Sequence, residues 1–171
     1  MHHYLVKDIS HYCNVTLLKY GALTERPIPF YDFSFILDGS MTYYADGVKI
    51  LLKKNDAIFL PPGTIRTREA AENTVHFVSF NFTAMEDAFF SFPLYMPNCI
   101  NANIRKLVSL YPPSHLSSFY YTKEKCINML NYILLELAEA SKLTCNNEHV
   151  MKILHYIEEH ITENLTLQTI S

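Results

Sequence analysis

The stretch FYDFSFILDGSMTYYADGVKILLKKNDAIFLPPG, residues 30–63, decides the expected fold. Apolar side chains recur at every second position from Tyr31 to Leu37, which is typical of a strand with one buried face. Asp-Gly pairs at 38–39 and 46–47 favour hairpin turns, because glycine accepts a positive φ. A Pro-Pro-Gly corner at 61–63 ends the last apolar run, since proline has no N–H to donate to a neighbouring strand. The stretch therefore predicts four short strands at 30–37, 40–44, 48–52 and 57–60.

The strand pattern extends to both sides and then gives way to helices. We expect an edge strand at 15–20 and a further strand at 75–82, and many short strands at close spacing favour a barrel or a sandwich. Beyond about residue 101, apolar residues recur at spacings of three and four, which predicts helices at 101–110, 122–142 and 148–160. The expected fold class is mainly β with α: a barrel followed by C-terminal helices.

Composition limits the functions to consider. The chain has 171 residues, 49% of them hydrophobic, which is enough for one compact domain and a short appendage. Its formal net charge of −3 lacks the basic excess of a nucleic-acid-binding surface. The four cysteines are scattered, so we expect free thiols in a reducing compartment. With no secretory signal pattern and no apolar run of about 20 residues, we expect a cytoplasmic protein without membrane spans.

No pattern for metal binding or catalysis stands out. Eight histidines are present, but none forms an HxH pair near a strand carboxylate, and a zinc or iron site needs about three or four converging ligands. The sequence has no G-x-S-x-G elbow and no glycine-rich phosphate loop. We therefore expect no metal, no cofactor and no enzymatic activity.

Two arginines after the Pro-Pro-Gly corner are the most informative polar residues. If a strand resumes there, Arg66 and Arg68 are two positions apart and point to the same face. On the barrel interior they would need anionic or polar partners, which an acidic or hydroxyl-rich ligand supplies. Alternatively, both point to solvent or pair with Glu69 and Glu72. Arg26 carries the same ambiguity, whereas we expect His76 to be a structural or surface residue.

The helix at 122–142 carries an apolar stripe wider than one packing surface requires. It either packs only on the barrel, or packs there with one edge and on a second copy of the chain with the other. We favour a homodimer. The predicted interface residues are Ile127, Leu130, Leu134, Leu137 and Tyr121.

Two stretches carry a resemblance to a known family. Phe35-Ile-Leu-Asp-Gly39, Asp46-Gly47 and KNDAIFLPPG at 54–63 resemble the cupin signature of the N-terminal half of AraC/XylS-type bacterial transcription regulators. VMKILHYIEEHITENLTLQTI at 150–170 is similar to the first helix of that family's DNA-binding domain and the start of its first helix-turn-helix unit. The resemblance implies three parts: a cupin-like double-stranded β-helix barrel at 1–98, a helical dimerisation segment at 99–145, and the start of a truncated helix-turn-helix domain at 146–171.

The resemblance also implies a function. Such sensing domains bind a small effector, a sugar or another polar or anionic metabolite, inside the barrel and thereby control transcription through the paired DNA-binding halves. The pocket residues it implies are Arg66, Arg68, Arg26 and Phe77, with Tyr31, Phe33 and Tyr44 as apolar walls. The helix that reads bases is not among the 171 residues, so we expect DNA binding only through a further C-terminal part.

Two departures from the cupin pattern bear on the alternatives. Metal-binding cupins place a histidine where Arg66 stands, which argues against their chemistry. Asn55 stands where glycine is usual, and asparagine also tolerates a left-handed backbone. A metal-dependent cupin enzyme and an effector-free oligomerisation scaffold remain as alternatives.

Overall fold

The computed structural model describes residues 5–70, 73–86, 88, 90–111, 114–115 and 120–144. The chain divides into two compact units, 1–136 and 137–171, and the first contains every described strand, the first helix and most of the second. The predicted helix at 148–160 and the predicted helix-turn-helix start at 146–171 lie outside the described residues. The elements are β1 (Val6–Leu17), β2 (Leu23–Pro27), β3 (Tyr31–Asp38), β4 (Ser40–Ala45), β5 (Val48–Lys53), β6 (Ala57–Leu60), β7 (Ile65–Arg68), β8 (Val75–Ala84), β9 (Tyr95–Met96), α1 (Ala102–Ser109), β10 (Ser114–His115) and α2 (Tyr120–Thr144).

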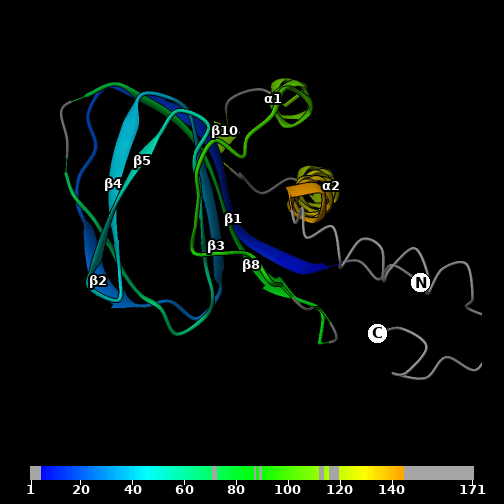
Figure 1. Ribbon diagram of the computed structural model, residues 1–171, viewed down its shortest axis with the longest axis horizontal. Helices are drawn as coiled ribbons and strands as arrows, with labels where there is room; N and C mark the ends of the chain where they lie inside the picture. The colour runs from blue at the N-terminus through cyan, green and yellow to red at the C-terminus, as the bar shows by residue number, and fades with distance from the viewer. Residues whose placement is uncertain are drawn as a thin grey trace, which may run out of the picture. The chain divides into compact units, whose positions relative to one another are not determined.

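The strands form two antiparallel sheets that face each other (Figure 1). One sheet has the order β10-β1-β8-β3-β6-β9 and the other has the order β2-β7-β4-β5. Strand β4 pairs with β5, β3 with β6, β2 with β7 and β1 with β8, as if one long hairpin had been rolled up. This is the pairing of a jelly roll, the architecture to which cupin barrels belong. The predicted fold class, a cupin-like β barrel with C-terminal helices, is confirmed.

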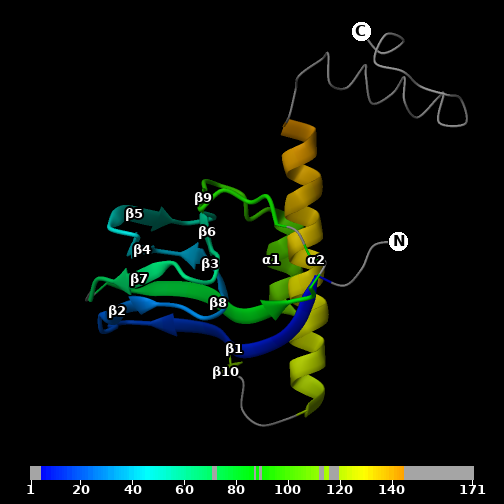
Figure 2. The same cartoon turned by 90° about the horizontal axis from the view of Figure 1, so that it is seen from below.

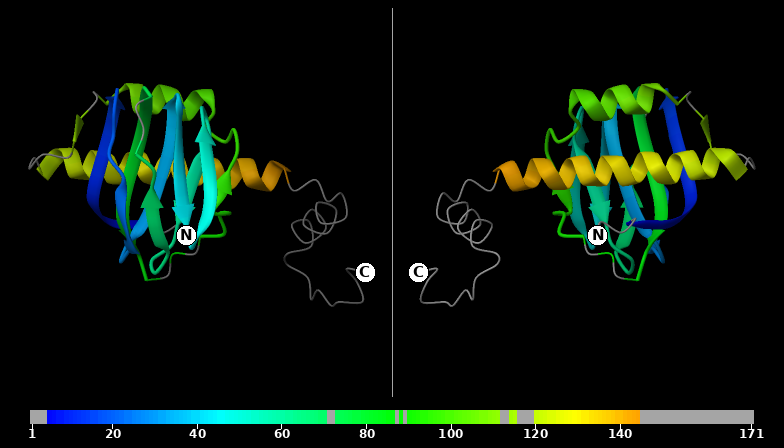
Figure 3. Two further views of the ribbon diagram at one scale, coloured as in Figure 1. Left: turned by 90° about the vertical axis from the view of Figure 1, so that its left-hand side faces the viewer. Right: turned by 90° about the vertical axis from the view of Figure 1, so that its right-hand side faces the viewer.

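The described helices cover one of the two sheets. Both α1 and α2, the latter up to Glu136, lie on the outer face of the six-stranded sheet, and none of the described helices of this unit lies over the four-stranded sheet (Figures 2 and 3). Two hydrogen bonds fasten α2 to β1, since the Asn131 side-chain oxygen accepts from the backbone N–H groups of Leu5 and Val6, both at 3.0 Å. Helix α1 begins at the predicted place, where the Asn101 side chain caps it by accepting from the Ile104 N–H at 3.0 Å.

Strand β3 is buried on both faces because it lies between a core inside the barrel and a second core under the helices. Its aromatic residues, Phe33 and Phe35, are 0% exposed and face the helices, whereas Ile36 belongs to the core cluster between the sheets. Alternation along the strand therefore sends Asp32 and Ser34 into the barrel. The buried face predicted for 31–37 exists, but it is the outer one.

Both Asp-Gly pairs form tight turns, but only the second closes a hairpin; the hairpin predicted at 38–39 is wrong, because β3 and β4 lie in different sheets and pair with other strands. Asp46 and Gly47 both have positive φ, 49° and 79°, as the two-residue hairpin between β4 and β5 requires. Gly39 has φ 81°, and a Cβ there would stand 2.4 Å from the Thr74 carbonyl oxygen, so no other residue fits. Asn55 has φ 72°, in agreement with the left-handed backbone expected for it.

One predicted strand has the wrong bounds. The expected edge strand at 15–20 is the end of β1, which begins at Val6 and lies between β10 and β8 rather than at an edge. Its first half alternates polar and apolar residues less regularly, because register shifts between Val6 and Asp8 and between Ile9 and His11 interrupt the pairing with β8.

Candidate ligand-binding site

A cavity of about 240 Å³ lies between the two sheets, and we name it the barrel cavity. This volume is below the roughly 300–1,000 Å³ of pockets for drug-sized ligands. Strand β1 supplies one wall, β8 the adjoining wall, and β7 with β4 the opposite one. The lining residues are His11, Cys13, Val15, Leu17, Leu23, Tyr43, Arg66, Arg68, Phe77, Ser79 and Asn81.

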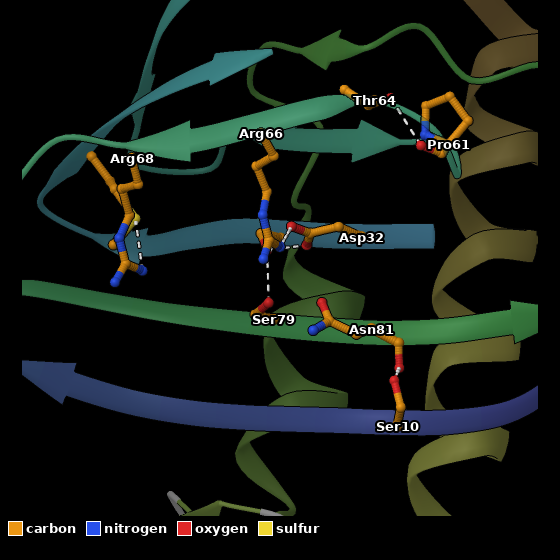
Figure 4. A network of polar contacts seen from close by, with 10 residues as sticks. Ser10, Asp32, Pro61, Thr64, Arg66, Arg68, Ser79 and Asn81 are labelled. Carbon is orange, nitrogen blue, oxygen red and sulfur yellow. Dashed lines mark hydrogen bonds and ion pairs between the residues drawn. The ribbon is translucent and has the colours of Figure 1, made fainter. Parts of the chain in front are cut away.

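Arg66 enters this space but is neutralised inside it. Its guanidinium forms an ion pair with Asp32 on β3, whose side chain is 0% exposed (Figure 4). The other carboxylate oxygen of Asp32 accepts a hydrogen bond from the Ser34 hydroxyl at 2.7 Å, and that hydroxyl lies 2.8 Å from the Ser79 hydroxyl. The charge of Arg66 is thus balanced by the protein itself.

Arg68 points into the same cavity but has no carboxylate partner among the described residues. Its nearest acceptors are weak: the Met41 sulfur at 3.8 Å from Nη1 and the Gly21 carbonyl at 3.4 Å from Nη2. The guanidinium instead lies against two aromatic rings, 5.0 Å from the centre of Tyr20 and 5.8 Å from that of Phe77. Arg68 is therefore a partly buried cation held in place by rings and left without an anion.

Two buried polar atoms of the cavity residues have no hydrogen-bond partner in the part of the chain that the structure describes: Arg68 Nε, a donor, and Asn81 Oδ1, an acceptor. Buried polar groups normally have partners, because an unmade hydrogen bond costs about 1–3 kcal/mol. A ligand that accepts at Arg68 and donates at Asn81 would satisfy both.

The buried Cys13 thiol and Tyr43 hydroxyl of the cavity are neutral at physiological pH. Burial raises the pKa of the Cys13 thiol to about 11, although the positive charge of Arg68 opposes the shift. Burial likewise raises the pKa of the Tyr43 hydroxyl to about 12. The cavity therefore contains no thiolate nucleophile, and its charged groups are the Asp32–Arg66 pair and Arg68, with His11 as a further titratable side chain in the lining.

The structure brings some of the predicted site residues together and separates others. Arg66, Arg68 and Phe77 line the barrel cavity. Arg26 is opposite Arg66 in the β2–β7 pairing, but it is exposed and does not line the cavity. Tyr44 faces away from the barrel, where its hydroxyl donates to Glu69; its neighbour Tyr43 faces inward.

Tyr31 and Phe33 do not line the barrel cavity either. Tyr31 packs against Phe82, Phe59 and Phe90 with ring centres 5.3, 5.7 and 5.1 Å apart. Phe33 lies 5.5 Å from Phe35 in the same layer, outside the six-stranded sheet. Both residues stabilise the core under the helices, so we remove them from the candidate site.

The sequence analysis missed two residues that bind to the lining side chains, and several of the lining itself: Asp32 and Ser34, and Tyr43, Cys13 and Asn81 respectively. The first two had a detectable pattern, because polar residues that alternate with aromatic ones in a buried strand must face another interior. Because a buried aspartate needs a positively charged partner, Asp32 predicts a cation nearby, and Arg66 is that cation. Nothing in the sequence distinguishes Arg66 from Arg68 in this respect.

The predicted dimer residues lie mostly inside the single chain. Leu130 and Leu134 are 0% exposed and Leu137 is 4% exposed, whereas Ile127 is half-buried. The Tyr121 side chain lies outside what the structure describes. On the opposite side of α2, Tyr132 and Leu135 are 46% and 41% exposed. Any pairing through this helix would have to use the latter residues.

Neither metal-ligand clusters nor membrane helices occur among the described residues. Within those ranges, no group of three or more His, Cys, Asp or Glu side chains is arranged to hold a metal ion. No helix there has the length and hydropathy to cross a bilayer.

No protein-family model matches the sequence, and comparison with curated proteins finds no significant match. Several solved structures are similar in fold. A Cupin 2 conserved barrel domain protein from Salinispora arenicola is 14% identical over 44% of this chain and 63% of its own, with a TM-score of 0.36. An RmlC-like cupin from Shewanella frigidimarina is 16% identical over 47% and 70%, with a TM-score of 0.34. KdgF from Halomonas sp. is 20% identical over 48% and 77%, with a TM-score of 0.35.

This chain spans only part of the structures it matches. The aligned region covers 66%, 63% and 52% of the first three of them. Identities and TM-scores this low carry no information about ligand or activity. The chain is thus a cupin-like barrel by its strand pairing, and its function has to be argued from its own residues.

Proposed function

We propose that this chain is the sensing module of an AraC-type transcription regulator and binds a small organic acid in the barrel cavity. The observation that carries the proposal is Arg68, a cation in the cavity without a carboxylate partner among the described residues. Removing a charge from water costs several kcal/mol unless an opposite charge compensates it. A carboxylate bound there would supply that compensation.

The cavity also limits the rest of the ligand. The unpartnered Asn81 oxygen requires a donor, so the ligand carries a hydroxyl or an amine besides its carboxylate. Phe77 and Val15 supply apolar contact, and about 240 Å³ suits a small metabolite. A hydroxy acid, an amino acid or a short sugar acid fits this chemistry.

The regulatory part of the proposal rests on the sequence resemblance at 150–170 and on a physical link between the cavity and α2. Strand β1 lines the cavity with Cys13 and Val15, and its first residues are held by Asn131 of α2. A second link joins the same elements, because Lys123 forms a 2.6 Å ion pair with Asp8. A shift of β1 on ligand binding would therefore act on α2, the helix that precedes the helix-turn-helix-like segment in the sequence.

Thermal-shift screening of the full chain against small carboxylic acids, with matched neutral amides and alcohols, tests the proposal. A ligand at 100 times its Kd stabilises the fold by about 2.7 kcal/mol through mass action. We expect hits among hydroxy or amino acids only, followed by calorimetric titration of the best one.

The variants Arg68→Gln and Arg26→Gln provide a matched pair. Each removes one guanidinium, from the cavity and from the exposed strand β2 respectively. We expect Arg68→Gln to abolish the shift and Arg26→Gln to retain it. Equal binding by both variants, or hits confined to neutral compounds, would contradict the proposal.

A further inference from the structure

A second hollow, of about 400 Å³, lies outside the barrel between α1 and the ends of β3 and β8. We name it the α1 pocket. Leu37 and Val108 form its apolar wall, and its polar lining comes from Asn14, Asp38, Lys54, His76, Arg105, Ser109 and Tyr111. It does not share a lining residue with the barrel cavity, because Asn14 and His76 project from the opposite face of β1 and β8 to Cys13 and Phe77.

Arg105 is fixed in this pocket by neutral groups alone. Its Nε donates to the Asn55 side-chain oxygen at 2.9 Å, and Nη2 donates to the Leu37 carbonyl at 2.8 Å and to the same Asn55 oxygen. Nη1 makes no hydrogen bond within the described part of the chain, and no carboxylate there forms an ion pair with this guanidinium. Arg105 is thus oriented but not neutralised.

Asn55 fixes the orientation of the Arg105 side chain. Its backbone is left-handed, with φ 72°, a conformation that glycine adopts more readily. Glycine would provide the turn but not the side-chain oxygen that holds Arg105. Asparagine supplies both.

His76 faces the pocket beside Arg105. Its Nε2 lies 2.8 Å from the Asn14 side-chain oxygen, which fixes the ring and leaves Nδ1 as the second nitrogen. The charged groups around it are Arg105 from α1, Asp38 at the end of β3 and Lys54 from the turn before β6. Asp38 is already paired with Lys54 at 3.1 Å, so the pocket keeps a net positive charge from Arg105.

We infer that the α1 pocket binds a small oxyanion, phosphate or a phosphate monoester, between Nη1 of Arg105 and the protonated ring of His76. Arginine presents paired donors that match oxyanion geometry. Burial and the nearby charge of Arg105 lower the pKa of His76 in the empty pocket, and a bound oxyanion reverses that effect by favouring the imidazolium. Binding therefore tightens as the pH falls below about 6.5, the ordinary pKa of histidine. The volume leaves room for the organic part of a monoester.

Titration of the full chain with inorganic phosphate, followed by NMR of the histidine ring signals, tests this inference. The His76 signals are assigned by their loss in His76→Gln. We expect phosphate to move them and to raise the apparent pKa of that ring. A monoester such as methyl phosphate, titrated in parallel, distinguishes free phosphate from a phosphorylated metabolite by which of the two binds more tightly.

Arg105→Gln and Lys106→Gln are the matched variants, because they remove neighbouring cations of α1 and only Arg105 lines the pocket. We expect Arg105→Gln to weaken phosphate binding about tenfold or more, as the loss of a charge-assisted hydrogen bond does, and Lys106→Gln to leave it unchanged. His76→Gln should lose the part of the pH dependence that the imidazole contributes, so that only the second ionisation of the phosphate group, at about pH 6, still affects its binding. Unchanged affinity in Arg105→Gln, or no movement of the His76 signals by either ligand, overturns the inference.

Discussion

At the scale of the residue, two arginines of the same strand have opposite roles. Arg66 and Arg68 are alternate residues of β7 and enter the same cavity, yet only Arg66 meets a carboxylate. The difference arises from β3, which places Asp32 opposite one of them. The same residue type, two positions apart on one strand, forms a buried ion pair in one case and has no anionic partner among the described residues in the other.

This division gives a stability prediction for the Asp32–Arg66 pair. Arg66→Met leaves Asp32 as an uncompensated charge at 0% exposure, which costs about 3 kcal/mol, the lower end for broken buried pairs, because Ser34 still donates to it. Combining Arg66→Met with Asp32→Asn removes both charges, and we expect the double variant to recover to within about 1 kcal/mol of the parent. Urea denaturation of the single and double variants measures both values.

Arg68→Met is the matched control for that experiment. Arg68 has no anionic partner in the described residues, so its removal leaves no buried carboxylate without a counter-charge. We expect a change in unfolding free energy within about 1 kcal/mol. Equal losses of unfolding free energy in Arg66→Met and Arg68→Met would contradict a stabilising role for the Asp32–Arg66 ion pair.

The sequence predicted that the two arginines share a face, but neither that this face is the barrel interior nor which groups oppose them. Two-residue periodicity after the Pro-Pro-Gly corner was enough to place Arg66 and Arg68 on one face. The identity of the opposing groups depends on how β3, β7 and β8 meet across the barrel, and these strands are far apart in the chain. The same limit explains Tyr31 and Phe33: periodicity showed that their face is buried, but it could not tell the barrel interior from the layer under the helices.

At the scale of the element, α2 shows the same limit. Its wide apolar stripe predicted two contact surfaces, and the structure shows one of them, with Leu130 and Leu134 buried in the single chain. The exposed apolar residues, Tyr132 and Leu135, are three positions apart on the other side. The width of the stripe left both alternatives open, because assigning individual residues to one surface requires the position of the sheet.

The homodimer therefore remains a prediction, and its test uses exposed residues of α2 in place of the buried ones first predicted. Leu135→Glu introduces a charge on the exposed side of α2, and we expect it to shift a dimer towards monomer while the unfolding free energy stays within about 0.5 kcal/mol of the parent, as is usual for surface substitutions. Light scattering coupled to gel filtration measures the mass. Leu134→Ala is the contrasting variant: it should cost about 3 kcal/mol of stability through the cavity it leaves. A parent protein that is monomeric at high concentration would refute pairing through this helix.

At the scale of the whole molecule, the β1–β8 pair separates two pockets, one inside the barrel and one outside it beside α1. The β1–β8 pair carries Cys13 and Phe77 on its inner face and Asn14 and His76 on its outer face. The local pattern of turns and alternation predicted the strands and the β4–β5 hairpin, whereas the pairings β3–β6, β2–β7 and β1–β8 join strands far apart in the chain. The two pockets were not predictable in the same way, since each combines residues from at least three elements.

The α1 pocket makes the stability of the whole molecule depend on pH. The pKa of His76 is lowered in the folded chain, so near pH 6.5 the unfolded chain binds a proton more readily than the folded one. Folding stability then falls as the pH drops through and below that value, by at most about 1.4 kcal/mol per pH unit for one such group. His76→Gln removes this contribution, so its unfolding free energy should fall less than that of the parent between about pH 7.5 and pH 5.5 in chloride buffer.

In phosphate the proton is retained by the folded state, and the parent's loss should shrink while the variant's stays the same. An equal pH dependence of the unfolding free energy in parent and variant, in both buffers, would contradict the lowered pKa of His76 in the folded chain.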